Sequence, residues 1–571
     1  MGRPARFLSA QRTGSTSHKN KMSTLCSFAK GENIQLFLLC HKIQRKNAAF
    51  NTLLMSRREW LPASYPAFRI LQVLQKISGH TGRGCKQQEE RSFIMDSIIH
   101  QIADWAVSAN DFVNGIVWGV PMLMLIGCVG LYYTIRLHGV QFRKFKEIFK
   151  NTIGNTHPDG DKSKAGADSG KALTSFQAAM TSVSAVVGSG NIAGVATALV
   201  CGGPGALFWM CLVASLGMAT KYAEIVLGIL YRRKNPDGTY EGGAMYYLAD
   251  GLHQPWLGKL FAFLVIPFAF VVSAVVDTNT MATTFEAQFS IDPLVSGIVL
   301  AALTGIVIFG GVKRIGKVCE WLSPIMGGMY VLAGLSIILL HLDRLPTAVA
   351  SIIYGAFNPS ALTGGAIGSI FMCMRYGIAR GMFSNEAGLG TTAMIHSGAD
   401  VSHPIKQAMW GPMEVFLDTI IICNVTGLPI VMSGLWSGGE FDGATLTMRA
   451  FEKLLPGSIG MWICLLAVLL FGFSCLISCY TYALRASTYL FGKKSIVVIK
   501  TLWLAFIVIG AQSTLGFVWN LADTFNGLMI IPNLVGLMLL SRQVLRAHND
   551  YWGVERSAVC KSKRMRCKHA H

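Results

Sequence analysis

The chain has 571 residues, of which 52% are hydrophobic and only 14% are charged. A soluble domain carries roughly 25% charged residues, so this composition, with a mean hydropathy of +0.45, excludes an ordinary soluble protein and indicates a polytopic membrane protein. The net charge of +20 comes mostly from cytoplasmic loops and a basic N-terminal arm, and it does not indicate a nucleic acid partner. None of the 14 cysteines forms a CxxC pair, so neither a disulfide framework nor a cysteine-based metal site follows from them. We expect no cofactor.

The first 94 residues form a basic arm that carries 16 Lys and Arg against 4 Asp and Glu. The arm lacks helical periodicity, and its apolar run from Ile34 to Cys40 is too short for the core of a signal peptide. We expect it to be disordered or foreign to the working protein, which then begins with the acidic, amphipathic lead-in at Met95. The alternative is an arm that binds nucleic acid or anionic lipid.

Eleven apolar segments then follow, each long enough to cross a bilayer, which takes about 20 residues. Lys and Arg stay on the cytoplasmic side of a membrane. The basic loops around Arg143, Arg232, Lys313, Arg485 and Arg546 therefore place the N-terminal end of this core outside and the C-terminus in the cytoplasm. The expected spans cover residues 113–135, 172–202, 205–230, 258–286, 293–312, 317–341, 363–383, 405–433, 459–484, 496–515 and 517–540.

The second of these segments is interrupted in its middle by Gly188-Ser189-Gly190-Asn191. Glycine destabilises a helix interior by about 1 kcal/mol relative to alanine, and an interruption in lipid is tolerated only where the freed backbone groups face a cavity or an ion. The break therefore predicts a binding site, and the positive end of the second half-helix suits a small carboxylate. A glycine-rich packing seam between helices is the alternative.

A second interruption occurs at the matching position once the first span is set aside as an accessory helix. There the apolar run Gly364 to Ile378 continues into the polar, Gly-rich stretch Ala379 to Gly390. Two interrupted helices at corresponding positions of two five-helix halves indicate an inverted-repeat secondary transporter with its site near the membrane midplane. A chance Gly-rich loop is the alternative.

Five motifs resemble the alanine/glycine:cation symporter family, the sodium/alanine symporters of prokaryotes. They are, in order, GSGNIAGVATA, GGPGALFWM, GMATKYAEIVLG, EGGAMYYL and ARGMFSNEAGLG. The resemblance covers Met95 to about Arg546. It implies an all-α, leucine-transporter-like 5+5 inverted repeat with one accessory N-terminal helix, in the plasma membrane of a prokaryote. The expected parts are an extension (1–94), an accessory helix and cytoplasmic loop (95–170), two repeats (171–345 and 346–546) and a basic cytoplasmic tail (547–571).

The resemblance also implies where the substrate binds. Its carboxylate is expected on the backbone of Gly188, Ser189, Gly190 and Asn191, which agrees with the affinity of helix N-termini for anions. Two further substrate candidates are Gln177 and Phe383, for which helix contact and apolar packing are the alternatives.

The fourth span contains Asp277 and Asn279, and a carboxylate at membrane depth is destabilising unless it is paired. The family usually has a glutamine in place of Asp277 and an asparagine at the position of Asn279. A carboxylate at 277 would receive the substrate ammonium, alter the selectivity or hold a proton. The alternative is a solvated residue near the outer end of the helix.

For the cation, the wider fold implies carbonyl oxygens at the first break that face hydroxyls of the ninth span. Cys475 stands where the family often has a threonine, and a thiol is a poor ligand for Na⁺. Close helix packing is the alternative role of the serines. The expected ligands are the carbonyls of Ser184 and Val187, the hydroxyls of Ser474 and Ser478, and, for a second cation, the side chain of Asn191.

Charged residues within the later spans need partners. We expect Arg380 and Glu386 to form an ion pair that serves as a gate or scaffold, because a lone charge there is destabilising. Glu414 and Asp418 share one face of the eighth span, and their role stays open, with proton coupling as one option.

These features predict a secondary transporter, not an enzyme, that imports alanine or glycine with Na⁺. The alternatives are an H⁺-coupled symporter of the same or another amino acid, such as D-alanine or glutamine, and a transporter-fold amino-acid sensor. A channel would need a continuous polar lining, an intramembrane enzyme would need a catalytic set such as HExxH, and an ATP-driven pump would need a P-loop. The spans show none of these signs.

Overall fold

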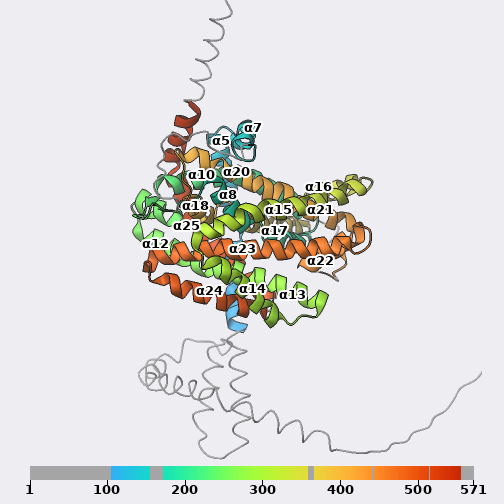
Figure 1. The fold of residues 1–571 in the computed structure, drawn as a ribbon. Helices are drawn as coiled ribbons and strands as arrows, with labels where there is room; N and C mark the ends of the chain where they lie inside the picture. The colour runs from blue at the N-terminus through green and yellow to red at the C-terminus, as the bar shows by residue number, and fades with distance from the viewer. Residues whose placement is uncertain are drawn as a thin grey trace, which may run out of the picture. The chain divides into compact units, whose positions relative to one another are not determined.

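The computed structural model describes residues 104–154, 172–357, 366–439, 441, 443–513 and 515–553. The chain divides into two compact units, residues 1–106 and 107–571, and only the described part of the second unit is treated below. The expected basic arm, residues 1–94, lies outside the described residues. The described part is helical apart from one hairpin of two short strands and the connecting loops (Figure 1).

The elements of the first half are α5 (Val120–Arg136), α6 (Val140–Arg143), α7 (Phe145–Asn151), α8 (Ser175–Val186), η1 (Ser189–Asn191), α9 (Ala193–Gly202), α10 (Gly205–Leu230), β1 (Arg233–Lys234), β2 (Tyr240–Glu241), α11 (Ala244–Tyr246), η2 (Tyr247–Gly251), α12 (Pro255–Ala269), η3 (Phe270–Asp277), α13 (Thr278–Phe289), α14 (Pro293–Ile308) and α15 (Gly311–Leu340). Those of the second half are α16 (Leu345–Phe357), α17 (Ala366–Asn385), α18 (Thr391–His396), α19 (Pro404–Ala408), α20 (Trp410–Val415), η5 (Phe416–Cys423), α21 (Asn424–Ser433), η6 (Leu435–Ser437), α22 (Gly443–Leu454), α23 (Ile459–Phe491), α24 (Ser495–Ala511) and α25 (Leu515–Leu539).

Six described helices are long and apolar enough to cross a membrane, and the number rises to eight if each of two bent pairs is one span. Three shorter apolar helices, α14, α16 and α24, accompany them. The predicted all-α membrane class is therefore confirmed, whereas the count of eleven crossings stays a prediction. The amphipathic helix α22 lies in a stretch for which the sequence predicted only a loop.

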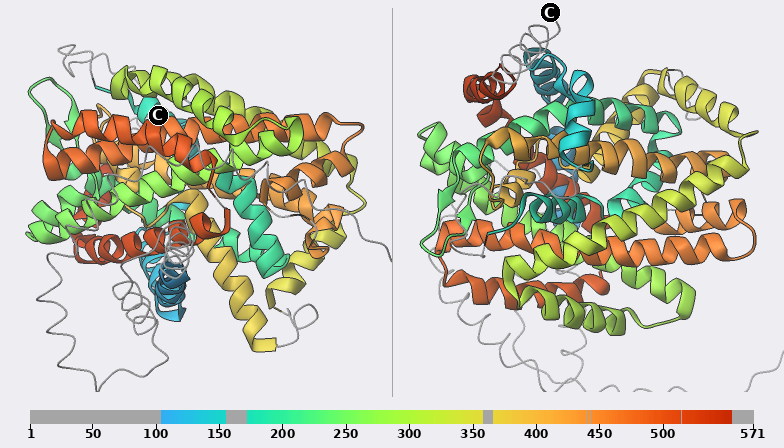
Figure 2. Two further views of the ribbon diagram at one scale, coloured as in Figure 1. Left: turned by 90° about the horizontal axis from the view of Figure 1, so that it is seen from below. Right: turned by 45° about the horizontal axis from the view of Figure 1, so that its top comes forward.

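Small residues let several helices approach closely, as is usual between helices in membranes. A Cβ atom on Gly205, at the start of α10, would lie 2.3 Å from the backbone nitrogen of Ala356 in α16, so only glycine fits there. Helices α14 and α24 pack on each other along one side of the helix bundle (Figures 1 and 2), where a Cβ on Gly297 would lie 2.8 Å from the Cβ of Ala511. Small residues thus bring α10 to α16 and α14 to α24 at close range.

Both predicted helix interruptions are present, but the second begins later than predicted. Helix α17 continues through Ala379 to Asn385, and the interruption itself covers Glu386 to Gly390. Helices α8 and α9 are bent by 55° across the short 3₁₀ turn η1. Between α17 and α18 the backbone is left-handed at Glu386, Gly388 and Gly390, with φ values of 53°, 100° and 80°. A positive φ is uncommon for a residue with a side chain such as Glu386, so the surrounding contacts must hold this turn.

Two π-helical segments, η3 and η5, lie within long helices. Each carries a buried carboxylate, Asp277 in η3 and Asp418 in η5. Such segments are rare and frequently occur at functional sites. They bring these two carboxylates against the first helix break, as the distances below show.

The α8 end of the bundle is covered by hydrogen-bonded loops. The guanidinium of Arg232 donates to the carbonyl oxygens of Ala399 and Val401, and Arg485 donates to the carbonyl oxygen of Met394. A β-bridge between Leu173 and Ala399 fastens the start of α8 to the same loop. These bonds fasten the loop after α18 to the start of α8 and to α23.

Candidate functional site

The first break is built around the carboxylate of Asp277. Its Oδ1 accepts hydrogen bonds from the backbone nitrogen of Ser189, at 3.2 Å, and from the Ser189 hydroxyl, at 2.5 Å. Its other oxygen, Oδ2, is buried and has no partner among the described residues, and the residue is only 3% exposed. A buried oxygen without a donor is destabilising, so this atom is the strongest sign of a ligand at the break.

Asn191 fastens the other side of the break. Its Oδ1 accepts from the backbone nitrogen of Gly188 at 3.0 Å, and its Nδ2 donates to Asp418 Oδ1 at 2.6 Å and to the Ser384 hydroxyl at 3.0 Å. Asp418 also accepts from Ser384 and from Thr419. The amide of Asn191 therefore joins the first break to η5 and to the end of α17.

The backbone of the second interruption is bound by buried charged and polar side chains. The ammonium of Lys221 donates to the carbonyl oxygen of Asn385 at 2.9 Å, and Glu224 accepts from the backbone nitrogen of Gly390 at 3.1 Å. Asn533 donates to the carbonyl oxygen of Gly388 at 2.8 Å and to Glu224. A fully buried lysine and glutamate of α10 thus satisfy groups that the broken helix leaves free.

Glu414 and Asp418 have different partners, although the sequence placed them on one helix face. Glu414 forms an ion pair with Lys221 at 3.1 Å, lies 2.7 Å from the Nε2 atom of His396, and accepts from the Ser182 hydroxyl. The π-helical segment begins at Phe416, between the two residues, so their side chains point in different directions. Glu414 consequently faces the second interruption, whereas Asp418 faces Asn191.

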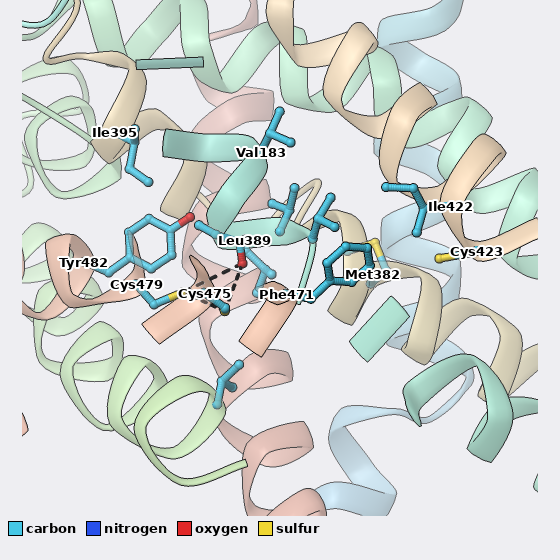
Figure 3. Close-up of a cluster of buried hydrophobic side chains, with 14 of the residues drawn as sticks. Val183, Met382, Leu389, Ile395, Ile422, Cys423, Phe471, Cys475, Cys479 and Tyr482 are labelled. Carbon is cyan, nitrogen blue, oxygen red and sulfur yellow. Dashed lines mark hydrogen bonds between the residues drawn. The ribbon is translucent and has the colours of Figure 1, made fainter. Parts of the chain in front are cut away.

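The last turn of α8 lies against α23 at the expected cation site. The Ser474 hydroxyl is 3.4 Å from the carbonyl oxygen of Ser184, and Cys475 Sγ is 3.3 Å from the carbonyl oxygen of Ala185. Cys479 lies beside Cys475, with 3.4 Å between the two sulfur atoms, and Figure 3 shows this pair in a cluster of apolar side chains. A Cβ on Gly188 would lie 3.3 Å from Cys475 Sγ and 3.5 Å from Asp277 Oδ1. Cys475 is therefore part of the break itself.

Other residues of the expected cation site lie slightly apart from it. The Ser184 hydroxyl is 2.5 Å from the Ser323 hydroxyl of α15, and the Ser478 hydroxyl is 3.3 Å from Cys319 Sγ of the same helix. Val187 is the C-terminal cap of α8 and is buried. Ser474 thus faces α8 directly, while Ser478, one turn along α23, contacts α15.

The predicted ion pair between Arg380 and Glu386 is wrong. Arg380 pairs instead with Asp523 of α25, at 2.7 Å. Glu386 accepts hydrogen bonds from the hydroxyls of Thr391, at 2.6 Å, and Tyr482, at 2.8 Å. The left-handed turn at Glu386 changes the chain direction after α17, so its side chain meets α18 and α23 rather than Arg380.

Phe383 covers the first break from the α9 side. A Cβ on Gly190 would lie 3.1 Å from its ring, and the ring centroid is 5.1 Å from that of Trp519 in α25. The Arg380 guanidinium lies 4.9 Å from the Trp519 ring. The aromatic pair and the ion pair with Asp523 thus form one layer above the break.

Two predicted substrate residues lie away from the break. Gln177 forms a capping box with Thr174 at the start of α8 and donates to Glu320 of α15 at 3.0 Å. Asn279 is two residues after Asp277, on a different side of its helix, and donates to the carbonyl oxygens of Gly510 and Ser513. Both side chains connect helices where the structure describes them.

A cavity of about 400 Å³ opens on the α9 side of the aromatic layer. We call it the α9-side cavity. It is lined by Asn114, Trp118, Ala193, Thr197, Cys201, Thr280, Thr283, Thr284, Arg375, Tyr376, Ala379, Arg380, Gly443, Ala444, Thr445, Trp519, Asn520 and Asp523.

Several residues of the site were not predicted as ligands. Ser384, Thr419 and Asp523 become neighbours of the predicted residues only when η5, α17 and α25 are packed together. Of these three residues, only Asp523 could have been found from the sequence, because it is an acidic residue inside an apolar span, as Asp418 is.

Several known proteins are similar to this chain. Residues 103–565 match the model of the "Sodium:alanine symporter family". The chain is 40% identical over 446 residues to "Sodium/alanine symporter AgcS" of Methanococcus maripaludis, which covers 77% of this chain and 96% of the relative. It is 34% identical over 462 residues to the "Putative sodium/proton-dependent alanine carrier protein YrbD" of Bacillus subtilis, covering 77% and 92%. Among solved structures, MhsT in complex with L-phenylalanine is similar at 12% identity and a TM-score of 0.48, over 66% of this chain and 99% of that one.

Proposed function

Because the chain belongs to the sodium:alanine symporter family, we propose that it imports a small neutral amino acid, alanine or glycine, together with Na⁺ across the plasma membrane of a prokaryote. One observation is the main support for placing the substrate at the first helix break. Asp277, buried at the first helix break, keeps one carboxylate oxygen without a partner among the described residues. The ammonium group of a zwitterionic substrate would supply the hydrogen-bond donor that this oxygen does not have.

The two ends of such a substrate meet complementary groups at the break. The substrate ammonium donates to Asp277 Oδ2, while the carboxylate turns toward the backbone of Gly188, Ser189 and Gly190 at the start of the second half-helix. Phe383 packs directly over Gly190, where even a Cβ would lie 3.1 Å from its ring, so a substrate bound there would need a side chain as small as a methyl group or a hydrogen. These contacts support alanine or glycine as substrate.

The cation site that we propose lies between α8 and α23. The carbonyl oxygens of Ser184 and Val187 and the hydroxyl of Ser474 provide hard oxygen donors, which suit Na⁺. Ser478 contributes from the next turn. The cluster of Asn191, Ser384 and Asp418 offers a second place for a cation, because its buried carboxylate has no basic partner within 4 Å among the described residues.

Access to the break is proposed to alternate between the two sides. On the α9 side, the Arg380–Asp523 ion pair and the Phe383–Trp519 ring pair separate the α9-side cavity from the break. On the α8 side, the loop bound by Arg232 and Arg485 performs the same role. The basic loops of the sequence assign the α9 side to the exterior.

Coupling to H⁺ is the second candidate, and a specific observation favours it. Four fully or almost fully buried carboxylates, of Glu224, Asp277, Glu386 and Asp418, have no Lys, Arg or His nitrogen within 4 Å among the described residues. An unpaired carboxylate in such surroundings is stabilised by a bound cation or by protonation. The relative named as a sodium/proton-dependent alanine carrier supports this candidate.

The test is uptake of radiolabelled alanine, glycine, D-alanine and glutamine into proteoliposomes that contain the purified chain. An inward Na⁺ gradient and an inward H⁺ gradient are imposed separately. We expect alanine or glycine to accumulate under the Na⁺ gradient. Accumulation under the H⁺ gradient alone would establish the second candidate, and binding without any accumulation would show a sensor instead of a transporter.

A further inference from the structure

The α9-side cavity has an excess of positive charge. Its volume of about 400 Å³ lies within the usual range of ligand pockets, about 300–1,000 Å³. Its charged lining residues are Arg375, Arg380 and Asp523, so one guanidinium remains in excess when all three are ionised. A cavity of this kind attracts an anionic group.

Both guanidiniums keep donors for such a group. Arg380 pairs with Asp523, yet its Nε atom is buried without a partner in the described part of the chain, and the residue is only 6% exposed. Arg375 donates to the neutral amide of Asn114 at 3.1 Å, and no described carboxylate lies within 4 Å of it. The planar guanidinium fork matches the two oxygens of a carboxylate. The unpartnered Nε of Arg380 thus points to a carboxylate ligand.

Helix α13 supplies acceptors for a positive group. Thr280, Thr283 and Thr284 all line the cavity. Their hydroxyls donate to backbone carbonyl oxygens one turn earlier, of Val276 in η3 and of Asn279 and Thr280 in α13, at 2.9, 2.8 and 2.6 Å. Because their hydrogens are used in this way, their oxygen lone pairs are left to accept from an ammonium group, which has three donors and no acceptor.

We propose that the α9-side cavity is a second binding site for the zwitterionic amino acid, occupied before the substrate reaches the first helix break. The carboxylate binds to Arg375 and to the Nε edge of Arg380, and the ammonium binds to the threonine oxygens of α13. This inference rests on the proposed function and adds a docking step to it. Since the arriving carboxylate shares Arg380 with Asp523, docking weakens the ion pair that separates the cavity from the break.

Equilibrium binding of radiolabelled L-alanine to the purified full chain in Na⁺ tests the proposal. We expect two alanine molecules per wild-type chain, and one in Arg375→Gln, whose affinity at the cavity falls by about 10-fold or more. Asp277→Asn weakens the site at the break by roughly 10- to 100-fold, so at alanine concentrations that fill only the cavity it also leaves one. Arg449→Gln, the same substitution on an exposed arginine of α22, retains both. Thr283→Val removes one acceptor at nearly constant volume and should weaken the same site as Arg375→Gln. It tests the cavity independently if the arginine variant does not fold.

The outcomes separate this inference from the proposed function. One alanine per wild-type chain, unchanged by Arg375→Gln and Thr283→Val, would overturn the second site while uptake continues. An absence of both binding and uptake would overturn the proposed function as well. Propionate, which has the carboxylate but lacks the ammonium, should displace alanine from the cavity at least 10-fold less effectively than glycine; equal displacement would overturn the assignment to a zwitterion.

Discussion

The Nδ2 atom of Asn191 lies 2.6 Å from Oδ1 of Asp418, so a buried hydrogen bond joins the first helix break to the π-helical segment η5. Ser384, at the end of α17, contacts both residues. A ligand that moves Asn191 therefore acts directly on the helix that contains the second interruption. Through these hydrogen bonds, a change at the first helix break can be transmitted to the helix that precedes the second interruption.

Asn191→Ala should raise the Na⁺ concentration for half-maximal uptake several-fold. The substitution removes the amide that positions both Gly188 and Asp418, and it leaves the Asp418 carboxylate with one donor fewer. The measurement is the Na⁺ dependence of alanine uptake in proteoliposomes. Asn424→Ala is the matched control, because Asn424 donates to Cys211 and to carbonyl oxygens of η5 and forms no hydrogen bond with Asn191 or the Asp418 carboxylate. An unchanged Na⁺ dependence in Asn191→Ala would show that Asn191 takes no part in Na⁺ binding.

Asp277→Asn should weaken alanine binding by about 1.5–3 kcal/mol, which is roughly 10- to 100-fold, because a charge-assisted hydrogen bond to the ammonium is lost. The Na⁺ requirement should stay the same. Binding and uptake are measured between about pH 5.5 and 8.5, because a residue that carries the coupling proton would instead flatten the pH profile on substitution. Asp292→Asn, at the exposed start of α14, is the control. Normal affinity together with a normal pH profile would exclude both roles.

Cys475→Thr should lower the Na⁺ concentration for half-maximal uptake. Cys475 Sγ lies 3.3 Å from the carbonyl oxygen of Ala185, at the edge of the proposed cation site, and a hydroxyl oxygen is a harder donor than a thiol. Cys464→Thr makes the same exchange elsewhere in α23 and should leave the Na⁺ dependence unaltered. If both variants behave like the wild type, the side chain at 475 does not face the ion.

Arg380→Gln and Asp523→Asn should each abolish most uptake, because each leaves the opposite, largely buried charge unpaired, at a cost of about 3–5 kcal/mol. The double variant should recover part of the activity, since neither charge then remains alone. Uptake rates for the four proteins give the coupling between the two residues. Strictly additive losses would show that the ion pair is not the contact that matters.

A chain that starts at Met95 should insert and transport like the full chain, since the residues that match the family model begin at 103. Uptake per inserted molecule is compared for the two versions. Loss of insertion in the shorter chain would show that the arm belongs to the working protein.

The sequence by itself determined the membrane class, the family, the place of the first helix break and the region of the second, which begins at Glu386 and not at Ala379. Long apolar runs must become helices in lipid, and glycine clusters such as Gly188 to Gly190 are where such helices unwind, so these features are local and readable in order. Asp277 was singled out for the same reason, as a carboxylate in an apolar span. Its unpartnered oxygen is a property of the packed structure.

Only the tertiary structure decided which side chains meet. Arg380 pairs with Asp523, 143 residues away, and Asn191 pairs with Asp418, 227 residues away, although Glu386 is much nearer to Arg380 in the chain. The left-handed turn at Glu386 and the π-helical segment η5 change the directions in which the following side chains point. The regular 3.6-residue period of an α-helix does not predict these changes. Partner choice between distant helices depends on packing and on the balance of buried charge, and both exist only in the folded chain.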